Sequence, residues 1–185
     1  APAWRARADA VLTGIGTVLE DDPQLDVRGV PTPRQPALVI VDSRLQTPLD
    51  ARLWHAAPRS VHLYTAVADD TRHQSLRERG ARVVVLPDAR GKVDLAAMLK
   101  DLAAQEINEV HVEAGHKLNG SLWRAGLVDE LLLYLAPRLL GEGAGIAALG
   151  PFSALDQAPA LAWLDVDRVG PDVRLRARGL GRDRF

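Results

Sequence analysis

The stretch Val110-His-Val-Glu-Ala-Gly-His-Lys-Leu-Asn-Gly-Ser121 decides how the rest of the chain is interpreted. A short apolar run ends at Glu113, Gly115 permits a turn, and the residues after it suit the start of a helix. In an open α/β sheet, ligands bind outside the carboxyl ends of the strands, and the N–H groups of a helix start suit a phosphate. We therefore expect Glu113 at a strand end, beside an anion site built from the main chain of residues 115–121. An ordinary strand-to-helix connection with a surface glutamate explains the same stretch, because one glycine turn is a weak signal.

Composition limits the classes of protein to which the chain can belong. Its 185 residues suffice for one sizeable domain, and a net charge of −1 argues against a broad nucleic-acid surface. The absence of cysteine excludes disulfides, thiolate metal sites and a cysteine nucleophile. The five histidines show no metal-ligand spacing, so we expect no metal site. No apolar run reaches membrane length and no signal peptide is visible, which favours a cytoplasmic location.

A second turn with ligand-binding character follows the first predicted strand, residues 9–13. Gly14 and Gly16 permit a tight turn with exposed N–H groups, and Thr17 adds a hydroxyl at the start of a short helix. This pattern suits a phosphate cradle, although a plain turn has the same composition.

A third candidate site follows residues 37–41, a continuous apolar run that predicts a central strand buried on both faces. Asp42, Ser43 and Arg44 come directly after it. Ser43 and Arg44 have the chemistry to hold a phosphate. A turn capped by the side chain of Asp42 or Ser43, with an exposed arginine, fits equally well.

Further along the chain, the pattern predicts strands that alternate with helices and then a C-terminal antiparallel pair. Residues 141–145 form a glycine-rich loop that is either a mobile surface loop or a segment that closes over a cofactor. Arginines alternate along the last strand, which predicts a solvated sheet face. The expected strands are residues 61–65, 81–86, 129–135, 161–168 and 172–178, and the expected helices are residues 69–79 and 94–105.

This order of elements predicts one three-layer α/β domain with a mixed, mostly parallel sheet over residues 1–178. Residues 179–185 are expected to form a polar tail. The three turns should meet at one edge of the sheet, where two backbone-rich turns and several hydroxyls suit an extended ligand with more than one phosphate. Physical reasoning thus leads to a nucleotide- or phosphate-binding α/β domain.

Several motifs in a fixed order resemble the C-terminal reductase domain of the bifunctional riboflavin-biosynthesis deaminase/reductase family. They are RARADAVLTGIGTVLEDDPQLDVR at 5–28, VIVDSRLQTPLDARL at 39–53, VEAGHKLNGSL at 112–122 and AGLVDELLLYLAPRLLG at 125–141. The resemblance covers nearly the whole chain. It implies a dihydrofolate-reductase-like fold, NADPH as hydride donor and a homodimer. The implied reaction reduces 5-amino-6-(5-phosphoribosylamino)uracil to 5-amino-6-(5-phosphoribitylamino)uracil.

The resemblance also assigns roles to individual residues. The cofactor-binding residues that it implies are Thr17, Asp21, Ser43, Gly115, His116, Lys117, Leu118, Asn119, Gly120 and Ser121. The substrate-binding residues that it implies are Arg5, Leu25, Arg28 and Glu113. The two arginines have the chemistry to pair with the substrate phosphate, and Glu113 can accept hydrogen bonds from the sugar or the pyrimidine. Glu113 is also the one candidate for a catalytic acid.

The chain departs from the family pattern in three places. The family's opening strand and the start of the next helix are expected before Ala1. Gln46 stands where an arginine is common, which leaves Arg44 to bind the 2′-phosphate of NADPH. The chain has no H-x-E or P-C-x-x-C deaminase motif, so a fused or upstream deaminase is a candidate partner.

Two alternative functions stay open at this point. One is a related reductase of the same fold that acts on another pterin-like substrate. The other is a catalytically silent nucleotide-binding or dimerisation module.

Overall fold

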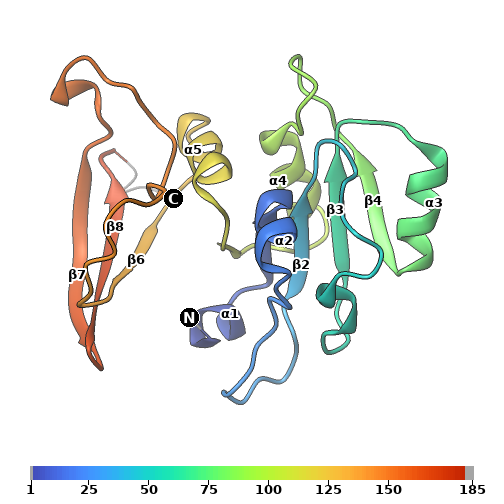
Figure 1. The fold of residues 1–185 in the computed structure, drawn as a ribbon, viewed down its shortest axis with the longest axis horizontal. Coiled ribbons are helices and arrows are strands. Elements are labelled where there is room, and N and C mark those ends of the chain that lie inside the picture. Colours follow the sequence, from blue (N-terminus) through green and yellow to red (C-terminus); the bar gives the residue numbers. More distant parts are fainter. Residues whose placement is uncertain (1, 182–185) are drawn as a thin grey trace. The chain divides into compact units, whose positions relative to one another are not determined.

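The computed structural model describes residues 2–181 and divides the chain into two compact units, Ala1–Gly115 and His116–Phe185 (Figure 1). The first unit alternates strands with helices, and the second carries an antiparallel sheet. The elements of the first unit are α1 (Pro2–Arg7), β1 (Ala10–Gly14), α2 (Ile15–Asp21), β2 (Ala37–Val41), the 3-10 helix η1 (Arg52–His55), β3 (Val61–Thr65), α3 (Asp70–Glu78), β4 (Ala81–Val85), α4 (Leu95–Ala103) and β5 (Val110–Val112).

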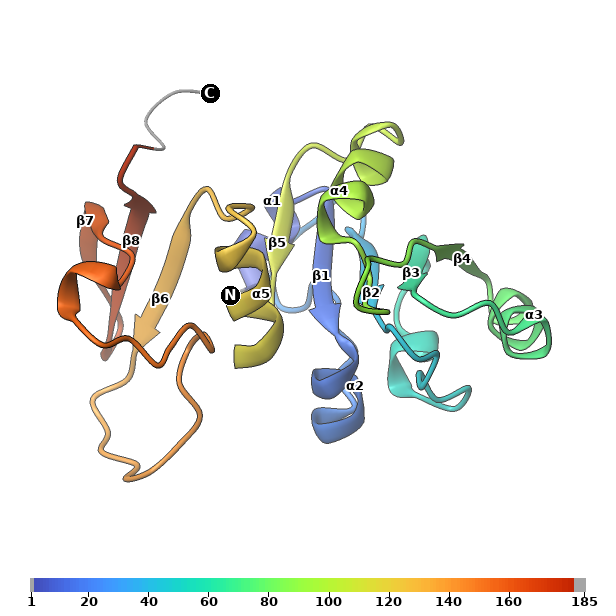
Figure 2. The ribbon, with the colours of Figure 1, turned by 90° about the horizontal axis from the view of Figure 1, so that it is seen from above.

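The sheet of the first unit is wholly parallel and has the strand order β4-β3-β2-β1-β5. All residues of β1, β2 and β3 are buried, as expected for parallel strands covered on both faces. The apolar run at 37–41 is therefore a central strand, as the sequence predicted. Figure 2, seen from above, shows the five strands in this order with the helices around them.

Helices cover both faces of this sheet, which gives the first unit its three layers. Successive side chains of a strand point to opposite faces. Leu63 of β3 belongs to a buried cluster with Leu53 of η1 and Leu76 of α3. On the other face, the neighbouring Tyr64 donates a hydrogen bond from its hydroxyl to Asp101 of α4 (2.6 Å). Met98 and Leu102 of α4 are fully buried.

The two longer helices of this unit begin at side-chain caps. Asp69 accepts a hydrogen bond from the N–H of Arg72, and Asp94 accepts one from the N–H of Ala97. These bonds satisfy N–H groups that the first turn of a helix leaves unpaired. The predicted bounds, 69–79 and 94–105, therefore agree with the observed helices to within two residues.

The second unit contains α5 (His116–Arg124), β6 (Leu131–Leu135), the 3-10 helix η2 (Leu155–Gln157), β7 (Leu161–Val169) and β8 (Asp172–Gly179). Its sheet is antiparallel in the order β6-β8-β7. The sequence predicted one mixed sheet, whereas the structure has one parallel and one antiparallel sheet. The reason is that β8 pairs with β6 on one edge and with β7 on the other, so the C-terminal hairpin and β6 form a sheet of their own.

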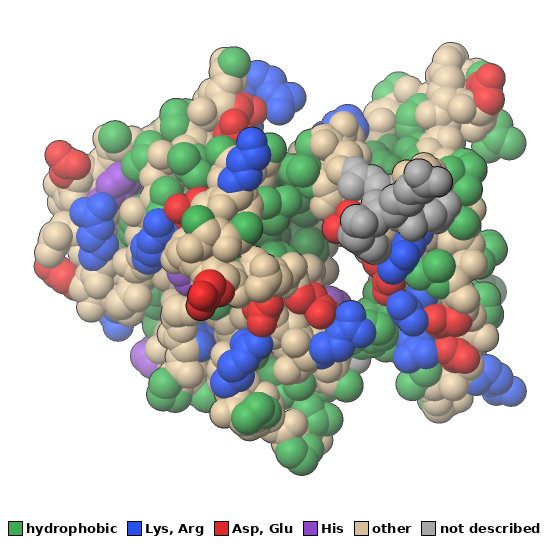
Figure 3. Space-filling model, turned by 180° about the vertical axis from the view of Figure 1, so that it is seen from behind, with side chains coloured by type: hydrophobic (Ala, Val, Ile, Leu, Met, Phe, Trp, Pro, Cys, Tyr) green, Lys and Arg blue, Asp and Glu red, His purple; other side chains and the backbone are tan. Residues whose placement is uncertain are grey.

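The alternating arginines of β8 form an ion-pair ladder and not the solvated face that the sequence predicted. Arg176 pairs with Glu130 (2.8 Å) and with Asp165 of β7 (2.7 Å), and Arg174 pairs with Asp167. Acidic and basic side chains accordingly intermingle over the antiparallel sheet (Figure 3). The correction arises because β7 places acidic residues in register with the arginines, a pairing that the separate sequence patterns did not reveal.

Two further details refine the sequence predictions. Gly179 belongs to β8 and not to a tail, and residues 182–185 lie outside the described part of the chain. The 3-10 helices η1 and η2 were not predicted, because three or four residues carry too little periodicity to be recognised. No helix in residues 2–181 is both long enough and apolar enough to span a bilayer.

Candidate functional site

The strand order marks one point at the carboxyl edge of the parallel sheet. From β1 the chain moves to β2, β3 and β4 on one side, and it returns to pair β5 with the other side of β1. The strand order therefore reverses between β1 and β5, and such a switch point is where open α/β sheets bind ligands. Gly14 ends β1 and Glu113 follows β5, so two of the three predicted turns adjoin this point.

Glu113 is held firmly at this strand end by its own main chain. Its N–H donates to the carbonyl of Leu12 (2.8 Å), and its carbonyl accepts from the hydroxyl of the buried Thr13 (2.9 Å). These two bonds continue the β1–β5 pairing one residue beyond the strand. The side chain of Glu113 is thus aimed by the sheet and not by a flexible loop.

A two-point hydrogen-bonded pair joins Glu113 to Arg5 of α1. Arg5 donates from Nε to Oε1 (2.5 Å) and from Nη2 to Oε2 (2.7 Å), and the two side chains are 16% and 25% exposed. Arg5 also donates from Nη1 to the carbonyl of Asp26 (2.9 Å). One arginine therefore connects the β5 end with residues 24–28, which we call the substrate loop because they hold the predicted Leu25 and Arg28.

These contacts fix the charge of Glu113. Burial by itself raises the pKa of this carboxyl group, but the hydrogen bonds from Arg5 and His111 and their charges outweigh it and lower the pKa to about 2. His111 Nε2 lies 3.4 Å from Oε1. Glu113 is therefore ionised at neutral pH. An ionised carboxylate accepts hydrogen bonds, so the geometry favours a binding role over the predicted role as a catalytic acid.

The substrate loop presents Arg28 to solvent. The Arg28 side chain is 63% exposed, and its Nε lies 3.0 Å from Oδ1 of Asp26. Arg5, by contrast, uses three of its five N–H groups on Glu113 and Asp26. Of the two arginines expected to meet a phosphate, Arg28 is the more accessible. Leu25 is buried at 4% exposure, so it shapes the loop from inside.

The predicted cofactor residues of α2 lie on one face of that helix. Thr17 and Asp21 are four residues apart, a spacing that brings side chains onto the same side of a helix. A β-carbon added to Gly115 would lie 3.9 Å from Oγ1 of Thr17, so Thr17 faces the main chain at Gly115. The turns after β1 and β5 thus approach each other as predicted.

The turn after β2 is held in shape by the side chain of Asp42. Asp42 is buried, and its side chain accepts from the N–H of Arg44 (3.3 Å) and from the N–H and hydroxyl of Thr47 (2.7 Å each). This is the expected side-chain-capped turn. Ser43 accepts a hydrogen bond from the N–H of Val93 (3.1 Å), which attaches the loop before α4 to the same edge.

A pocket of about 280 Å³ opens beside this turn. Arg44 and Lys92 both line it, and neither forms an ion pair with another described residue. The complete lining is Ile15, Val41, Ser43, Arg44, Gln46 and Lys92. Two cations and a hydroxyl form a donor set suited to a phosphate group. Sequence reasoning missed Lys92 because it lies outside every motif, and only the structure reveals the Ser43–Val93 hydrogen bond that brings its loop to this edge.

Residues 115–121 cross from the first unit into the second, and α5 begins at His116. Asn119 donates to the carbonyl of Ile146 (2.9 Å). A β-carbon on Gly120 would lie 2.3 Å from the carbonyl oxygen of Ala148, so only glycine permits this close approach. These two residues thus anchor the loop around residues 146–148. The first-turn N–H groups of α5 have no acceptor within the helix, and their use by a pyrophosphate stays a prediction.

Comparison with known proteins agrees with this arrangement. The family model of the RibD C-terminal domain matches residues 2–175. The chain belongs to the RibD C-terminal domain family. The chain is 34% identical to riboflavin biosynthesis protein RibD of Escherichia coli (strain K12) over 188 residues, which cover 95% of this chain and 50% of that protein. The family membership that the sequence motifs suggested is thereby confirmed.

Other relatives and a solved structure extend the comparison. A 2,5-diamino-6-ribosylamino-4(3H)-pyrimidinone 5′-phosphate reductase of Archaeoglobus fulgidus is 34% identical over 74% of this chain and 65% of its own. A 5-amino-6-(5-phosphoribosylamino)uracil reductase of Buchnera aphidicola is 25% identical over 93% of this chain and 87% of its own. The structure of Acinetobacter baumannii RibD matches with a TM-score of 0.81 and 33% identity, covering 96% of this chain and 48% of that one. The chain spans about half the length of the RibD proteins that it matches.

Proposed function

We propose that this chain uses NADPH to reduce 5-amino-6-(5-phosphoribosylamino)uracil to 5-amino-6-(5-phosphoribitylamino)uracil. The observation that carries the proposal is the Arg5–Glu113 pair at the switch point of the parallel sheet. It joins an ionised carboxylate to a loop that ends in an exposed arginine. A phosphorylated sugar attached to a base with N–H groups needs both a cation and a hydrogen-bond acceptor. The RibD family membership supports the same substrate class.

The charges around the substrate loop favour an anion. The arginine side chains of Arg5, Arg28 and Arg59 carry three positive charges, while Asp26 and Glu113 carry two negative ones. The cluster is held together by the Arg5–Glu113 and Arg28–Asp26 pairs and by bonds from Arg59 to the loop main chain. The surplus positive charge suits the 5′-phosphate, and Arg28 is the residue with the freest access to it.

We place NADPH at the same sheet edge, on the side of the pocket beside Ser43. The pocket beside Ser43 offers Arg44 and Lys92 for a phosphate group, such as the 2′-phosphate that distinguishes NADPH from NADH. Thr17 and Asp21 of α2 would line the path between this pocket and the switch point. The main chain of residues 115–121 would bind the pyrophosphate. When bound, NADPH supplies the hydride.

The work of the protein is then to hold the sugar carbon for the transfer. The ribosylamine ring opens to an imine, C1′ of that imine takes up a hydride, and its nitrogen takes up a proton from solvent. The C=N bond becomes a C–N single bond, and the product is the ribitylamine. Glu113 is ionised and so accepts hydrogen bonds from the sugar hydroxyls or from the pyrimidine. Arg28 retains the phosphate while the ring is open.

The test is an assay of NADPH oxidation that depends on the aminouracil substrate, with product identified by mass spectrometry as the substrate plus two hydrogens. Parallel titrations of NADPH and NADH, followed by nicotinamide fluorescence, report the cofactor site separately. Substrate-dependent oxidation with a preference for NADPH is the expected outcome. Binding of NADPH without turnover of any pyrimidine substrate would instead favour a silent nucleotide-binding module.

A second candidate substrate is 2,5-diamino-6-ribosylamino-4(3H)-pyrimidinone 5′-phosphate, which the Archaeoglobus fulgidus relative is named for. The two candidates differ at one ring position, where an amino group replaces an oxo group. A deaminase is the class of enzyme that interconverts them, so we also propose a deaminase, fused or separate, as the working partner. The ratio of kcat/KM for the two compounds decides between them. A cytoplasmic location stays part of this proposal.

We further propose that the chain forms a homodimer through the antiparallel sheet. The strand register places Leu133 of β6, Leu175 of β8 and Val166 of β7 side by side on one face. On β7, Trp163 and Val166 are both 59% exposed, which is unusual for large apolar side chains. A second copy of the chain would cover them. Light scattering after size-exclusion chromatography should report a dimer, and Val166→Glu should convert it to a monomer.

A further inference from the structure

Two leucines in the first unit adopt a backbone conformation that leucine rarely tolerates. Leu25 has φ +52° and Leu45 has φ +55°, both in the left-handed region. A residue with a β-carbon adopts this conformation only at a cost in free energy, because the β-carbon crowds the main chain. Leu25 lies in the substrate loop. Leu45 lies in residues 42–47, which we call the coenzyme loop because three of them, Ser43, Arg44 and Gln46, line the pocket. Both leucine side chains are buried, which helps to hold the two turns in place.

A buried leucine anchors its side chain, but each loop is also held by an arginine from elsewhere in the chain. Arg59, between η1 and β3, donates from Nη1 to the carbonyl of Leu25 (2.6 Å) and from Nη2 to the carbonyl of Gln24. Arg72, in the first turn of α3, donates from Nε to the carbonyl of Leu45 (3.2 Å) and from Nη2 to the carbonyl of Thr47. In each case one guanidinium group donates hydrogen bonds to two main-chain carbonyls of one loop, including that of the left-handed leucine. We call this two-carbonyl contact the grip of the arginine on its loop.

The charge of Arg59 is kept in spite of its surroundings. Burial lowers the pKa of its guanidinium group to about 10, with the charge of Asp26 opposing this shift and that of Arg5 adding to it. Arg59 therefore remains protonated at neutral pH while it is held against carbonyl oxygens. A planar guanidinium group can donate to two carbonyls at once, which a lysine ammonium group cannot do with the same geometry.

Other side chains complete the grip on the substrate loop. Arg5 donates to the carbonyl of Asp26 (2.9 Å). The Gln35 side chain accepts from the N–H of Val27 (2.7 Å) and donates to its carbonyl (3.1 Å). With the two bonds from Arg59, main-chain groups of four successive residues, 24–27, are bound by side chains. The loop that ends at Arg28 is thus set before any ligand arrives.

We propose that Arg59 and Arg72 are positioning residues with separate duties. Arg59 fixes the substrate loop and so sets the affinity for the phosphoribosyl substrate. Arg72 fixes the coenzyme loop and so sets the affinity for NADPH. Neither side chain is assigned to touch either ligand. The assignment of each duty rests on the function proposed above, whereas the grip of each arginine on its loop does not.

The experiment compares Arg59→Lys and Arg72→Lys, which keep the charge but lose the two-carbonyl grip. Arg59→Lys should raise KM for the substrate about tenfold and leave Kd for NADPH within about twofold, because a small misplacement of binding groups has effects of this size or larger. Arg72→Lys should raise Kd for NADPH about tenfold and leave KM for the substrate within about twofold. Arg77→Lys, at an exposed position of the same helix as Arg72, is the matched control and should change neither constant.

Hydrogen exchange of the main-chain N–H groups, measured without ligand, tests the grip independently of the enzyme activity. Arg59→Lys should speed exchange at residues 24–28 only, and Arg72→Lys at residues 42–47 only. Gln35→Ala supplies a second variant of the substrate loop, with the same expected direction as Arg59→Lys, in case the arginine variant does not fold. Folded variants whose loops exchange as in the original chain, or variants that raise both binding constants alike, would overturn the proposal. If the variants show the expected exchange effects but the original chain binds neither NADPH nor the substrate, the proposed function is refuted and the positioning roles of the two arginines are not.

Discussion

Replacing Glu113 by glutamine tests the electrostatic account of the site most directly. Glu113→Gln keeps the size and shape of the side chain and removes its charge. Arg5, which is only 16% exposed, then keeps one neutral acceptor in place of a two-point ion pair. A partly buried guanidinium group without its counter-charge is the main source of the expected loss, since desolvation of that charge is no longer compensated.

The magnitude follows from the pKa of Glu113. A fall from 4.5 to about 2 corresponds to about 3 kcal/mol, at about 1.4 kcal/mol per pKa unit. Because a quarter of the Glu113 side chain is exposed, solvent screening reduces this electrostatic stabilisation. We therefore expect Glu113→Gln to lower the free energy of unfolding by about 2 kcal/mol. Because folding lowers this pKa, the stabilisation is fully present above about pH 4.5 and is lost as the pH falls toward 2.

The assay is urea unfolding of the original chain and of Glu113→Gln between pH 7 and pH 3. The difference in unfolding free energy should be largest at pH 7 and should lose more than half of its value by about pH 3, from the linkage relation. Glu109→Gln is the matched control. Glu109 pairs with Arg7, the two side chains are 43% and 60% exposed, and such a surface pair contributes about 0.5 kcal/mol or less.

Two results would refute this reasoning. One is a Glu113→Gln variant whose stability at pH 7 equals that of Glu109→Gln. The other is a stability difference that stays constant as the pH is lowered, which would mean that Glu113 does not change its charge in this range and that the Arg5 pair does not depress its pKa.

Three other changes test separate parts of the structure. Arg28→Ala should raise KM for the phosphoribosyl substrate about tenfold or more, the loss expected for a charge-assisted hydrogen bond, while fluorescence titration shows NADPH binding unchanged. Lys92→Ala or Arg44→Ala should raise Kd for NADPH about tenfold and change Kd for NADH by no more than about twofold, as measured by parallel titrations. An equal rise in both constants would show that the pocket does not recognise the 2′-phosphate. Gly120→Ala should lower the free energy of unfolding by about 2 kcal/mol in urea titrations, because its β-carbon would collide with the main chain of Ala148, and an unchanged midpoint would contradict that packing.

The sequence specified most of the first unit because its strands are short runs of apolar, largely β-branched residues between recognisable turns. The strands at 37–41 and 61–65 agree with the prediction residue for residue, and the helices at 70–78 and 95–103 begin directly after the predicted Asp69 and Asp94 caps. Local periodicity and capping are properties of contiguous residues, so they can be read without the fold. The ion-pair ladder of β8 could not be predicted from the sequence, because its acidic partners come from β7 and from Glu130.

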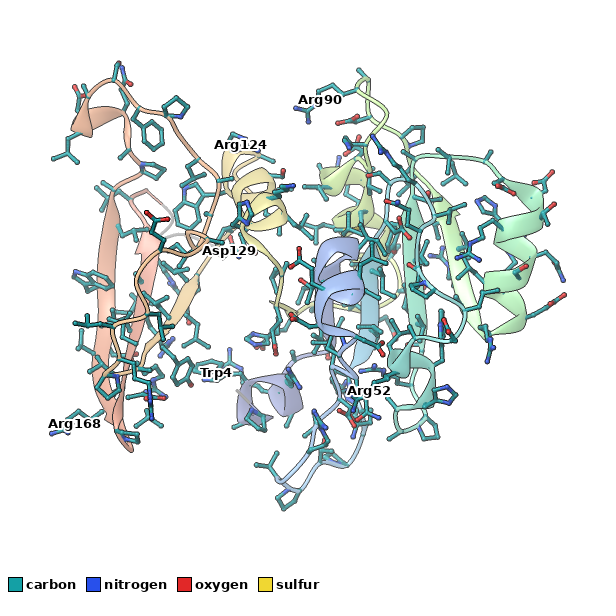
Figure 4. All side chains as sticks on the ribbon, in the orientation of Figure 1. Trp4, Arg52, Arg90, Arg124, Asp129 and Arg168 are labelled. Carbon is teal, nitrogen blue, oxygen red and sulfur yellow. The ribbon has the colours of Figure 1, made fainter. Side chains whose placement is uncertain are left out.

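Within the candidate site, the motifs located the strand ends but not the contacts among them. The sequence singled out Glu113, and the structure supplies its bidentate partner in Arg5, 108 residues earlier in the chain. Figure 4 shows Trp4 on α1, the helix that carries this arginine. The guanidinium carbon Cζ of Arg7, on the same helix, lies over the Trp4 ring at 5.0 Å from its centre. The same figure shows Arg52 on η1. The main-chain N–H of Arg52 donates to Oδ1 of Asp22, beside the substrate loop (2.8 Å).

What the sequence determined alone is the α/β alternation, the family and the set of strand ends with ligand-binding chemistry. The tertiary structure alone decided the lowered pKa of Glu113, the gathering of Lys92 with Ser43 and Arg44 around one pocket, and the hydrogen bonds from Arg59 and Arg72 to the carbonyls of two left-handed leucines. The physical reason is that a pKa, a pocket and a long-range hydrogen bond each depend on which distant residues meet. Sequence patterns report the neighbours of a residue along the chain, whereas its electrostatics depend on its neighbours in space.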